Sequence, residues 1–181
     1  MMLQTKMQQT MKLQTVTVMF CALMIFAGCS AEETMADPSI SINVDSELLE
    51  EGKVVIHSIF DNQGPRSITF LPWGTPFESM LTSPFLIINT QIADDLLPVP
   101  YEGIMIKRAP PQDKDYITVD SGQMHSNRLD ITKSYSFCRG LPYMITYMGP
   151  LLTLDNTKIK ITTATAKFIT GDSFPLCAPT E

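Results

Sequence analysis

The sequence has few of the residues from which catalytic and metal sites are built. It contains two histidines, His57 and His125, and neither lies in the H-E-x-x-H spacing of a zinc-binding helix. It also lacks a G-x-S-x-G turn and a glycine-rich phosphate-binding loop. These absences argue against the common zinc, serine-hydrolase and nucleotide sites, so we expect a protein that is not an enzyme and needs no cofactor or metal.

Basic residues are scarce as well. Lysine and arginine together number 13 against 19 aspartates and glutamates, which gives a formal net charge of −6. Nucleic-acid binding depends on a basic surface that displaces counterions from phosphates. We therefore expect no nucleic acid among the partners.

The N-terminal apolar run is too short for a transmembrane helix. Lys6 and Lys12 precede an apolar stretch over residues 16–26, whereas a spanning helix needs roughly 18 to 20 apolar residues. Basic residues before a short apolar core are typical of a signal peptide. The sequence predicts that residues 1–28 are removed and that the mature chain lies outside the cytoplasm.

Cys29 closes this region in the stretch "IFAGCS". Small residues directly before a cysteine resemble the lipobox of bacterial lipoproteins, which implies that Cys29 is acylated with palmitate-type chains and anchors the protein to a membrane. Each buried methylene contributes about 0.8 kcal/mol to such anchoring. Ser30 in place of aspartate favours the outer membrane of the bacterial envelope, facing the periplasm or the surface. The alternative is an ordinary secretory peptide with an incidental cysteine.

Two of the four cysteines remain for the folded domain, because Cys21 leaves with the signal and Cys29 carries lipid. In an oxidising compartment, Cys138 and Cys177 are expected to form a disulfide. Two free buried thiols are the alternative.

After a short acidic tether over residues 29–38, residues 39–181 have the pattern of a single β-domain. The stretch "SISINVD" alternates apolar and polar residues as a half-buried strand does. Helical turns are expected only at residues 45–52 and 92–97. The pattern predicts an all-β fold, an immunoglobulin-like two-sheet antiparallel sandwich of about seven to nine strands, with a small closed barrel as the alternative. The expected strands are 39–45, 53–60, 67–71, 85–88, 103–107, 116–119, 127–131, 143–148 and 158–163.

Three stretches carry a family resemblance: "FLPWGTPFES", "YEGIMIKRAPPQDKDYITVDSGQMHSNRLDITKSYSF" and "GLPYMITYMG". In order and spacing they resemble the N-terminal immunoglobulin-like pro-domain of the deuterolysin (aspzincin) metalloendopeptidases, over about residues 40–161. The matching positions are Trp73, Thr75, Pro76, Tyr101, Gly103, Lys107, Arg108, Pro111, Asp115, Tyr116, Gly122, Ser126, Asp130, Ile131, Tyr143, Ile145 and Tyr147.

In that family a catalytic domain with H-E-x-x-H follows the pro-domain, and this sequence contains no such motif. Since a pro-domain keeps its protease latent by covering the active-site cleft, the resemblance implies an inhibitor or folding partner of a secreted metalloprotease. The alternative is a structural or adhesion module of the envelope or cell surface with no protease partner. The oligomeric state stays open.

The residues that could meet a partner lie in the same stretches. Trp73 could anchor an interface or pack in the core. Lys107 and Arg108 could contact acidic groups of a protease cleft, lie solvated at a strand end, or pair internally with Asp113 or Asp115. The partner-binding candidates are Trp73, Thr75, Pro76, Tyr101, Lys107, Arg108, Pro111 and Tyr116.

Overall fold

The computed structural model describes residues 37–154, 158–159, 161 and 164–177. All of these residues belong to the second of the two units into which the chain divides, Met35–Glu181. The signal sequence, Cys29 and most of the acidic tether lie outside the described residues, so their predicted roles stay predictions.

The first sheet consists of three antiparallel strands in the order β1-β2-β7, namely β1 (Ser39–Val44), β2 (Val55–Asp61) and β7 (Met124–Asp130). The alternation read from the sequence sets its register, since Ile40 pairs with Phe60 and both are buried. A short helix, α2 (Ser46–Glu50), joins β1 to β2 as expected for residues 45–52. Asp45 caps it, because its Oδ1 accepts a hydrogen bond from the Leu48 N–H at 3.1 Å.

Two four-stranded antiparallel sheets complete the described fold. The second sheet has the order β10-β9-β3-β6 and comprises β3 (Ile68–Leu71), β6 (Ile117–Val119), β9 (Leu151–Thr153) and β10 (Lys158–Ile159). The third has the order β11-β8-β4-β5 and comprises β4 (Ile87–Ile92), β5 (Asp95–Pro98), β8 (Pro142–Tyr147) and β11 (Ala164–Ile169). A 3₁₀ turn, η1 (Asp113–Asp115), precedes β6.

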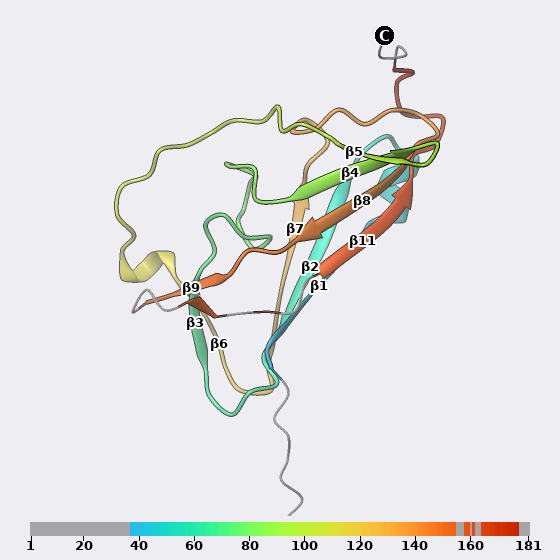
Figure 1. The fold of residues 1–181 in the computed structure, drawn as a ribbon. Coiled ribbons are helices and arrows are strands. Elements are labelled where there is room, and N and C mark those ends of the chain that lie inside the picture. The colour runs from blue at the N-terminus through green and yellow to red at the C-terminus, as the bar shows by residue number, and fades with distance from the viewer. Residues whose placement is uncertain (1–36, 155–157, 160, 162–163, 178–181) are drawn as a thin grey trace, which may run out of the picture. The chain divides into compact units, whose positions relative to one another are not determined.

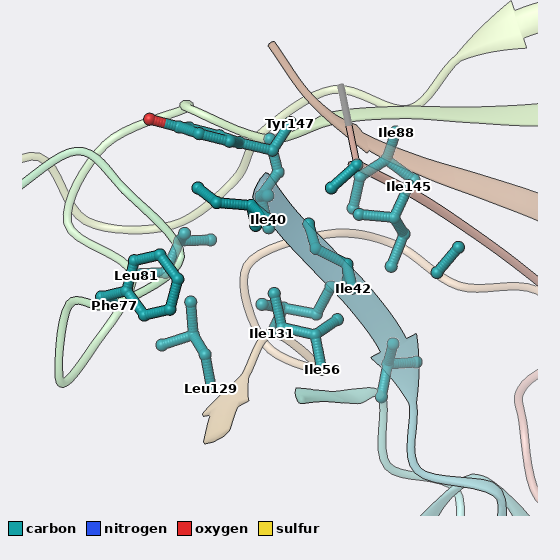
Figure 2. Packing of buried hydrophobic residues seen from close by; sticks show 14 of the residues in the cluster. Ile40, Ile42, Ile56, Phe77, Leu81, Ile88, Leu129, Ile131, Ile145 and Tyr147 are labelled. Atoms are coloured by element: carbon teal, nitrogen blue, oxygen red, sulfur yellow. The ribbon is translucent and has the colours of Figure 1, made fainter. Parts of the chain in front are cut away.

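A common apolar core joins the three sheets. Figure 2 shows side chains of β1, β2, β4 and β8 pointing toward one another, with Phe77 and Leu81 from the loop after β3 beside them. The rings of Phe60, Phe70 and Phe77 meet edge to face at centroid distances of 5.2 to 6.2 Å, which joins the first two sheets. Strand β1 also packs against β11 of the third sheet.

The expected all-β sandwich is therefore confirmed. The described residues form eleven strands in three open sheets, more than the seven to nine strands in two sheets expected from the sequence. Because each sheet is open, the closed-barrel alternative does not hold for the described residues. The additional strands include β9 and β11, which the alternation did not reveal.

Two local predictions were wrong. Residues 103–107 form no strand, because their apolar side chains face solvent and the segment joins none of the described sheets. Residues 92–97 form a hairpin between β4 and β5 rather than a helical turn. At its tip Ala93 has a φ of 53°, a left-handed value that reverses the chain direction and cannot continue a helix.

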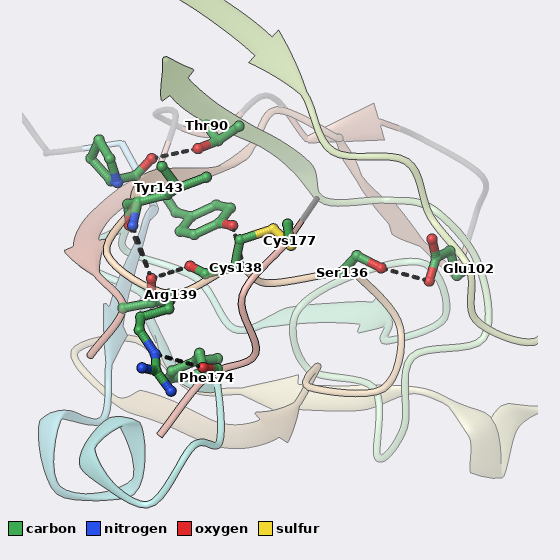
Figure 3. The surroundings of a disulfide bond; sticks show 11 residues. Thr90, Glu102, Ser136, Cys138, Arg139, Tyr143, Phe174 and Cys177 are labelled. Carbon is green, nitrogen blue, oxygen red and sulfur yellow. Dashed lines mark hydrogen bonds between the residues drawn. A yellow bond between two sulfur atoms is a disulfide. The ribbon is translucent and has the colours of Figure 1, made fainter. Parts of the chain in front are cut away.

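The predicted disulfide between Cys138 and Cys177 is present, with the Cα atoms 5.4 Å apart, so the alternative of two free thiols is wrong. Figure 3 shows how the neighbouring segment is held, since Arg139 Nε donates to the Phe174 carbonyl at 3.1 Å. The Phe174 ring is buried against Phe137. The bond therefore ties the C-terminal segment to the body of the domain.

None of the helices in the described ranges is long and apolar enough to cross a membrane.

Candidate partner-binding surface

The stretch "WGTPFE" forms a tight turn after β3. Pro72 O accepts hydrogen bonds from the Thr75 N–H at 3.1 Å and from Thr75 Oγ1 at 2.6 Å. Gly74 has a φ of 68°, where a side chain would be strained. Thr75 is only 2% exposed and Pro76 is also buried. These two predicted binding residues therefore shape the turn from within and are covered in this conformation.

The turn brings Glu78 under Arg108. The Glu78 carboxylate forms an ion pair with Arg108, and the two side chains are 3% and 29% exposed, respectively. Glu78 also accepts hydrogen bonds from Thr82 Oγ1 at 2.6 Å and from the Gly74 N–H at 3.0 Å. Arg108 Nη2 lies 3.1 Å from Thr82 Oγ1, and its guanidinium carbon lies 4.7 Å from the Trp73 ring centroid. We call Trp73, Glu78, Thr82 and Arg108 the Arg108 cluster.

This geometry shows how the side chains of Lys107, Arg108 and Trp73 lie in the folded domain. Arg108 pairs internally, as one of the alternatives held, but with Glu78 instead of Asp113 or Asp115. Trp73 is half-buried beside that guanidinium, so it is neither a deep core residue nor fully exposed. Lys107 remains exposed and free to meet a partner.

Tyr101 fixes the chain a few residues earlier. Its hydroxyl donates to the Ile104 carbonyl at 2.5 Å, and its ring meets that of Tyr135 edge to face at 5.5 Å. A Cβ atom on Gly103 would lie 2.5 Å from the Tyr101 ring, so only glycine fits there without movement. Burial raises the pKa of Tyr101, and the Glu78 carboxylate adds to the shift.

The same arrangement recurs at the end of β8. There the Tyr147 hydroxyl donates to the Pro150 carbonyl at 3.3 Å, and a Cβ on Gly149 would lie 2.9 Å from the ring. Both places have the same compact turn, which we call a tyrosine corner. The tyrosine ring lies against the glycine two positions later, and its hydroxyl donates to the carbonyl three positions later. Tyr101 with Gly103 and Tyr147 with Gly149 thus each form a local turn of the same kind.

Between Tyr101 and Arg108 the chain exposes consecutive apolar side chains. Ile104, Met105 and Ile106 are 56%, 76% and 47% exposed. We call residues 104–107 the exposed loop. In Figure 1 it belongs to the yellow-green segment that runs from β5 to η1 outside any strand. Contiguous exposed apolar side chains are a feature of many interaction sites, so the exposed loop is a candidate surface for a partner.

The remaining two candidates, Pro111 and Tyr116, lie on either side of η1. Pro111 is exposed and Tyr116 is half-buried directly before β6. Asp115 Oδ2 accepts from the Gln112 N–H at 2.8 Å, which closes the turn between them. The sequence analysis identified Trp73 and Arg108 as candidates but missed Glu78 and Thr82. These two residues contact Arg108 from 30 and 26 positions away in the chain, so the local sequence pattern does not reveal them.

The described residues contain no group of three or more histidines, cysteines, aspartates or glutamates that could hold a metal ion. His57 lies on β2 opposite Arg128. His125 packs against the Phe77 ring at 5.7 Å, and burial lowers its pKa. The two histidines therefore occupy sheet positions in the described fold.

No protein-family profile matches this chain. Its sequence is similar to an extracellular protease of Aeromonas hydrophila, with 29% identity over 136 residues. The matched region is 73% of this chain and 38% of that protease. The chain is thus similar to an extracellular protease over most of its own length and spans 38% of the length of that relative.

Among solved structures, two forms of a GH20 exo-β-N-acetylglucosaminidase from Vibrio harveyi align with 81% of this chain and 19% of the enzyme, at 16% and 17% identity. Both have a TM-score of 0.26. At that score the likeness supports no conclusion about fold or function.

Proposed function

We propose that this protein is a non-catalytic binding domain that inhibits, or assists the folding of, a secreted metalloprotease of the aspzincin type. The observation that carries the proposal is the similarity to an extracellular protease over 73% of this chain and 38% of the protease. A domain of this kind that supplied no active site of its own would act by binding the protease. The pro-domain resemblance of the sequence names the class of enzyme.

The exposed loop is the surface that best suits this role. An apolar segment with a neighbouring cation, Lys107, can enter a cleft whose walls are apolar and whose rim is acidic. The loop is held at one end by the Tyr101 corner and at the other by the Arg108 cluster. A segment ordered before binding loses less conformational entropy on docking.

The proposal includes attachment to the bacterial envelope. Its support is the lipobox-like "IFAGCS" and the short acidic stretch after it. A lipid on Cys29 would hold the domain at the membrane surface. There it would meet a protease during export and protect the producing cell.

Inhibition of a purified enzyme tests the proposal. A soluble form that begins after Cys29 is added to a panel of aspzincin-type metalloproteases, and cleavage of a peptide substrate is followed. We expect inhibition at micromolar concentration or below, weakened when Met105→Asp places a charge in the exposed loop. Met124→Asp, at a β7 residue that is 65% exposed, is the matched control and should inhibit like the original. Absence of both inhibition and binding across the panel would overturn the proposal.

One observation favours the alternative of an envelope or surface module. The outer face of the third sheet has a groove of about 530 Å³, where Asn89 and Gln91 lie among Leu96, Met144 and Lys167. A pull-down from the native envelope that recovers an envelope protein or glycan, and no protease, would support this second function.

A further inference from the structure

The Arg108 cluster joins two loops that are far apart in the sequence. Glu78 and Thr82 follow β3, whereas Arg108 lies in the segment between β5 and η1. The ion pair bridges 30 positions of the chain and involves no strand residue. Its direct effect is therefore to fix one loop upon another.

We propose that the Arg108 cluster is a positioning device that holds the exposed loop in a single conformation before a partner docks. The inference rests on the proposed function in one respect, that the docking partner is a protease. In this assignment Arg108 and Glu78 position the loop and leave the contacts with the partner to the residues beside them.

Burial makes the attachment strong. The Glu78 side chain is 3% exposed, and a buried carboxylate without a partner is costly because water no longer solvates it. Its oxygens are occupied by Arg108, by Thr82 Oγ1 and by the Gly74 N–H. Withdrawing Arg108 would leave the negative charge buried and unpaired, so Glu78 retains the guanidinium.

The Trp73 ring fixes the orientation of the Arg108 guanidinium. A guanidinium is planar and can stack on an aromatic face while its nitrogens hydrogen-bond in the plane, which a lysine ammonium cannot do. Arg108 makes both kinds of contact, to Trp73 and to Glu78. Because Lys107 directly precedes Arg108, fixing the guanidinium also restricts the end of the exposed loop.

Thr82 connects the cluster to the middle of the loop. Its carbonyl accepts a hydrogen bond from the Ile106 N–H at 3.2 Å, and its hydroxyl lies between Arg108 and Glu78. One residue thus holds both the loop backbone and the ion pair. A disturbance of the pair should therefore reach the Ile106 amide.

Hydrogen exchange of the full chain, as the cell processes it, tests the inference without any partner. Arg108→Lys keeps the positive charge and removes the planar guanidinium group with its several N–H donors. We expect the Ile106 amide to exchange at least about tenfold faster in this variant. Loss of the guanidinium lowers the free energy needed to break the hydrogen bond between the Ile106 N–H and the Thr82 carbonyl. Arg128→Lys changes another arginine ion pair, with Asp45, and should leave that amide unaffected. Unchanged exchange at Ile106 in Arg108→Lys would overturn the positioning role.

Protease inhibition by the same variants separates the two proposals. We expect inhibition by Arg108→Lys to weaken while Arg128→Lys inhibits like the original. Faster exchange with unaltered inhibition would show that the ordered loop is dispensable for docking and would overturn the inference. If the original chain inhibits no protease, the proposed function fails, and exchange alone decides whether the loop is positioned. Should Arg108→Lys fail to fold, Thr82→Val is the second variant, because it removes the hydroxyl that contacts both Arg108 and Glu78 with little change of side-chain shape. Its effect is measured by the exchange rate of the Ile106 amide.

Discussion

The guanidinium of Arg108 lies over the ring of Trp73, 4.7 Å from the ring centroid. Both residues were candidates for contact with a partner on the basis of the sequence, and in the folded domain they contact each other. In the proposed function, their contribution to binding would come through the shape they impose on the residues between Tyr101 and Arg108. The carboxylate of Glu78 beneath them explains why a cation is held at this place.

Replacing Glu78 by alanine should destabilise the domain by about 3 kcal/mol, since it leaves a partly buried cation and neighbouring donors without their acceptor. Urea unfolding followed by tryptophan fluorescence measures the change. Glu51→Ala is the control, because Glu51 pairs with Lys53 at a site where the side chains are 59% and 50% exposed. Such exposed pairs contribute about 0 to 1 kcal/mol. Equal effects of the two substitutions would contradict the prediction.

Gly103→Ala should destabilise the domain by about 1 to 3 kcal/mol, in the range of an overpacked site. Its new methyl group would lie 2.5 Å from the Tyr101 ring and force the ring from its place. Thermal or urea unfolding gives the difference in stability. At Gly171 a Cβ would have no heavy atom within 4 Å, so Gly171→Ala is the matched control and should change stability by less than about 1 kcal/mol. If Gly103→Ala behaves like Gly171→Ala, the tyrosine corner does not restrict this position.

The sequence could predict what depends on local pattern or on compartment. The alternation of apolar and polar residues identified β1. The expectation of an oxidising compartment led to the correct prediction of the disulfide between Cys138 and Cys177. Strand β11 escaped notice because Ala164 and Ala166, its buried positions, carry little hydrophobic signal. The run from Ile104 to Ile106 was mistaken for a strand, since apolarity alone does not reveal whether a neighbouring strand is available.

The sequence predicted only part of the candidate site, because the acidic partner of Arg108 comes from a distant segment of the chain. The sequence offered Asp113 and Asp115 as nearby acids for Arg108, and proximity along the chain made them the natural choices. The actual partner, Glu78, lies 30 positions away and is brought close by the turn at Gly74. Long-range pairing of this kind is a product of the whole fold.

Loss of the disulfide should cost about 3 to 4 kcal/mol, as expected from the chain entropy of the closed loop. The two cysteines are 39 positions apart, and their bond secures the segment that buries Phe174. Urea unfolding with and without a thiol reductant measures the effect. The Cys138→Ser, Cys177→Ser double variant should unfold at the lower midpoint and show no response to reductant. A midpoint that reductant does not change in the original chain would contradict the prediction.

Cys29→Ser should release the protein from the membrane if the cysteine carries the lipid. Two acyl chains bind a bilayer stably, whereas a chain from which residues 1–28 have been removed and which carries no lipid loses that attachment. Partition between detergent and aqueous phases, with incorporation of labelled palmitate, reports the change. Cys21→Ser is the control, because Cys21 lies within the predicted signal peptide. Labelling that persists in Cys29→Ser would refute the assignment of the lipid site.

Alkaline pH should weaken the fold through its buried tyrosines. Burial raises the pKa of Tyr135, Tyr143 and Tyr147 above the ordinary value of about 10. Between the unfolded and folded pKa values the native state binds more protons than the unfolded state, so stability is fully present below about pH 10 and falls as the pH rises beyond it. The urea midpoint should thus be steady at neutral pH and decline above about pH 10.

Phenolate absorbance provides the second measurement for the tyrosines. We expect part of the absorbance to develop only at the pH where the domain unfolds, because the Tyr147 ring is completely buried in the native state. Tyr135→Phe should reduce the late-developing part and lessen the decline of the midpoint, since it removes one group whose ionisation favours unfolding. If all the phenolate absorbance develops near the ordinary pKa while the domain stays folded, the hydroxyl groups are accessible to solvent and the linkage between burial and alkaline stability is wrong.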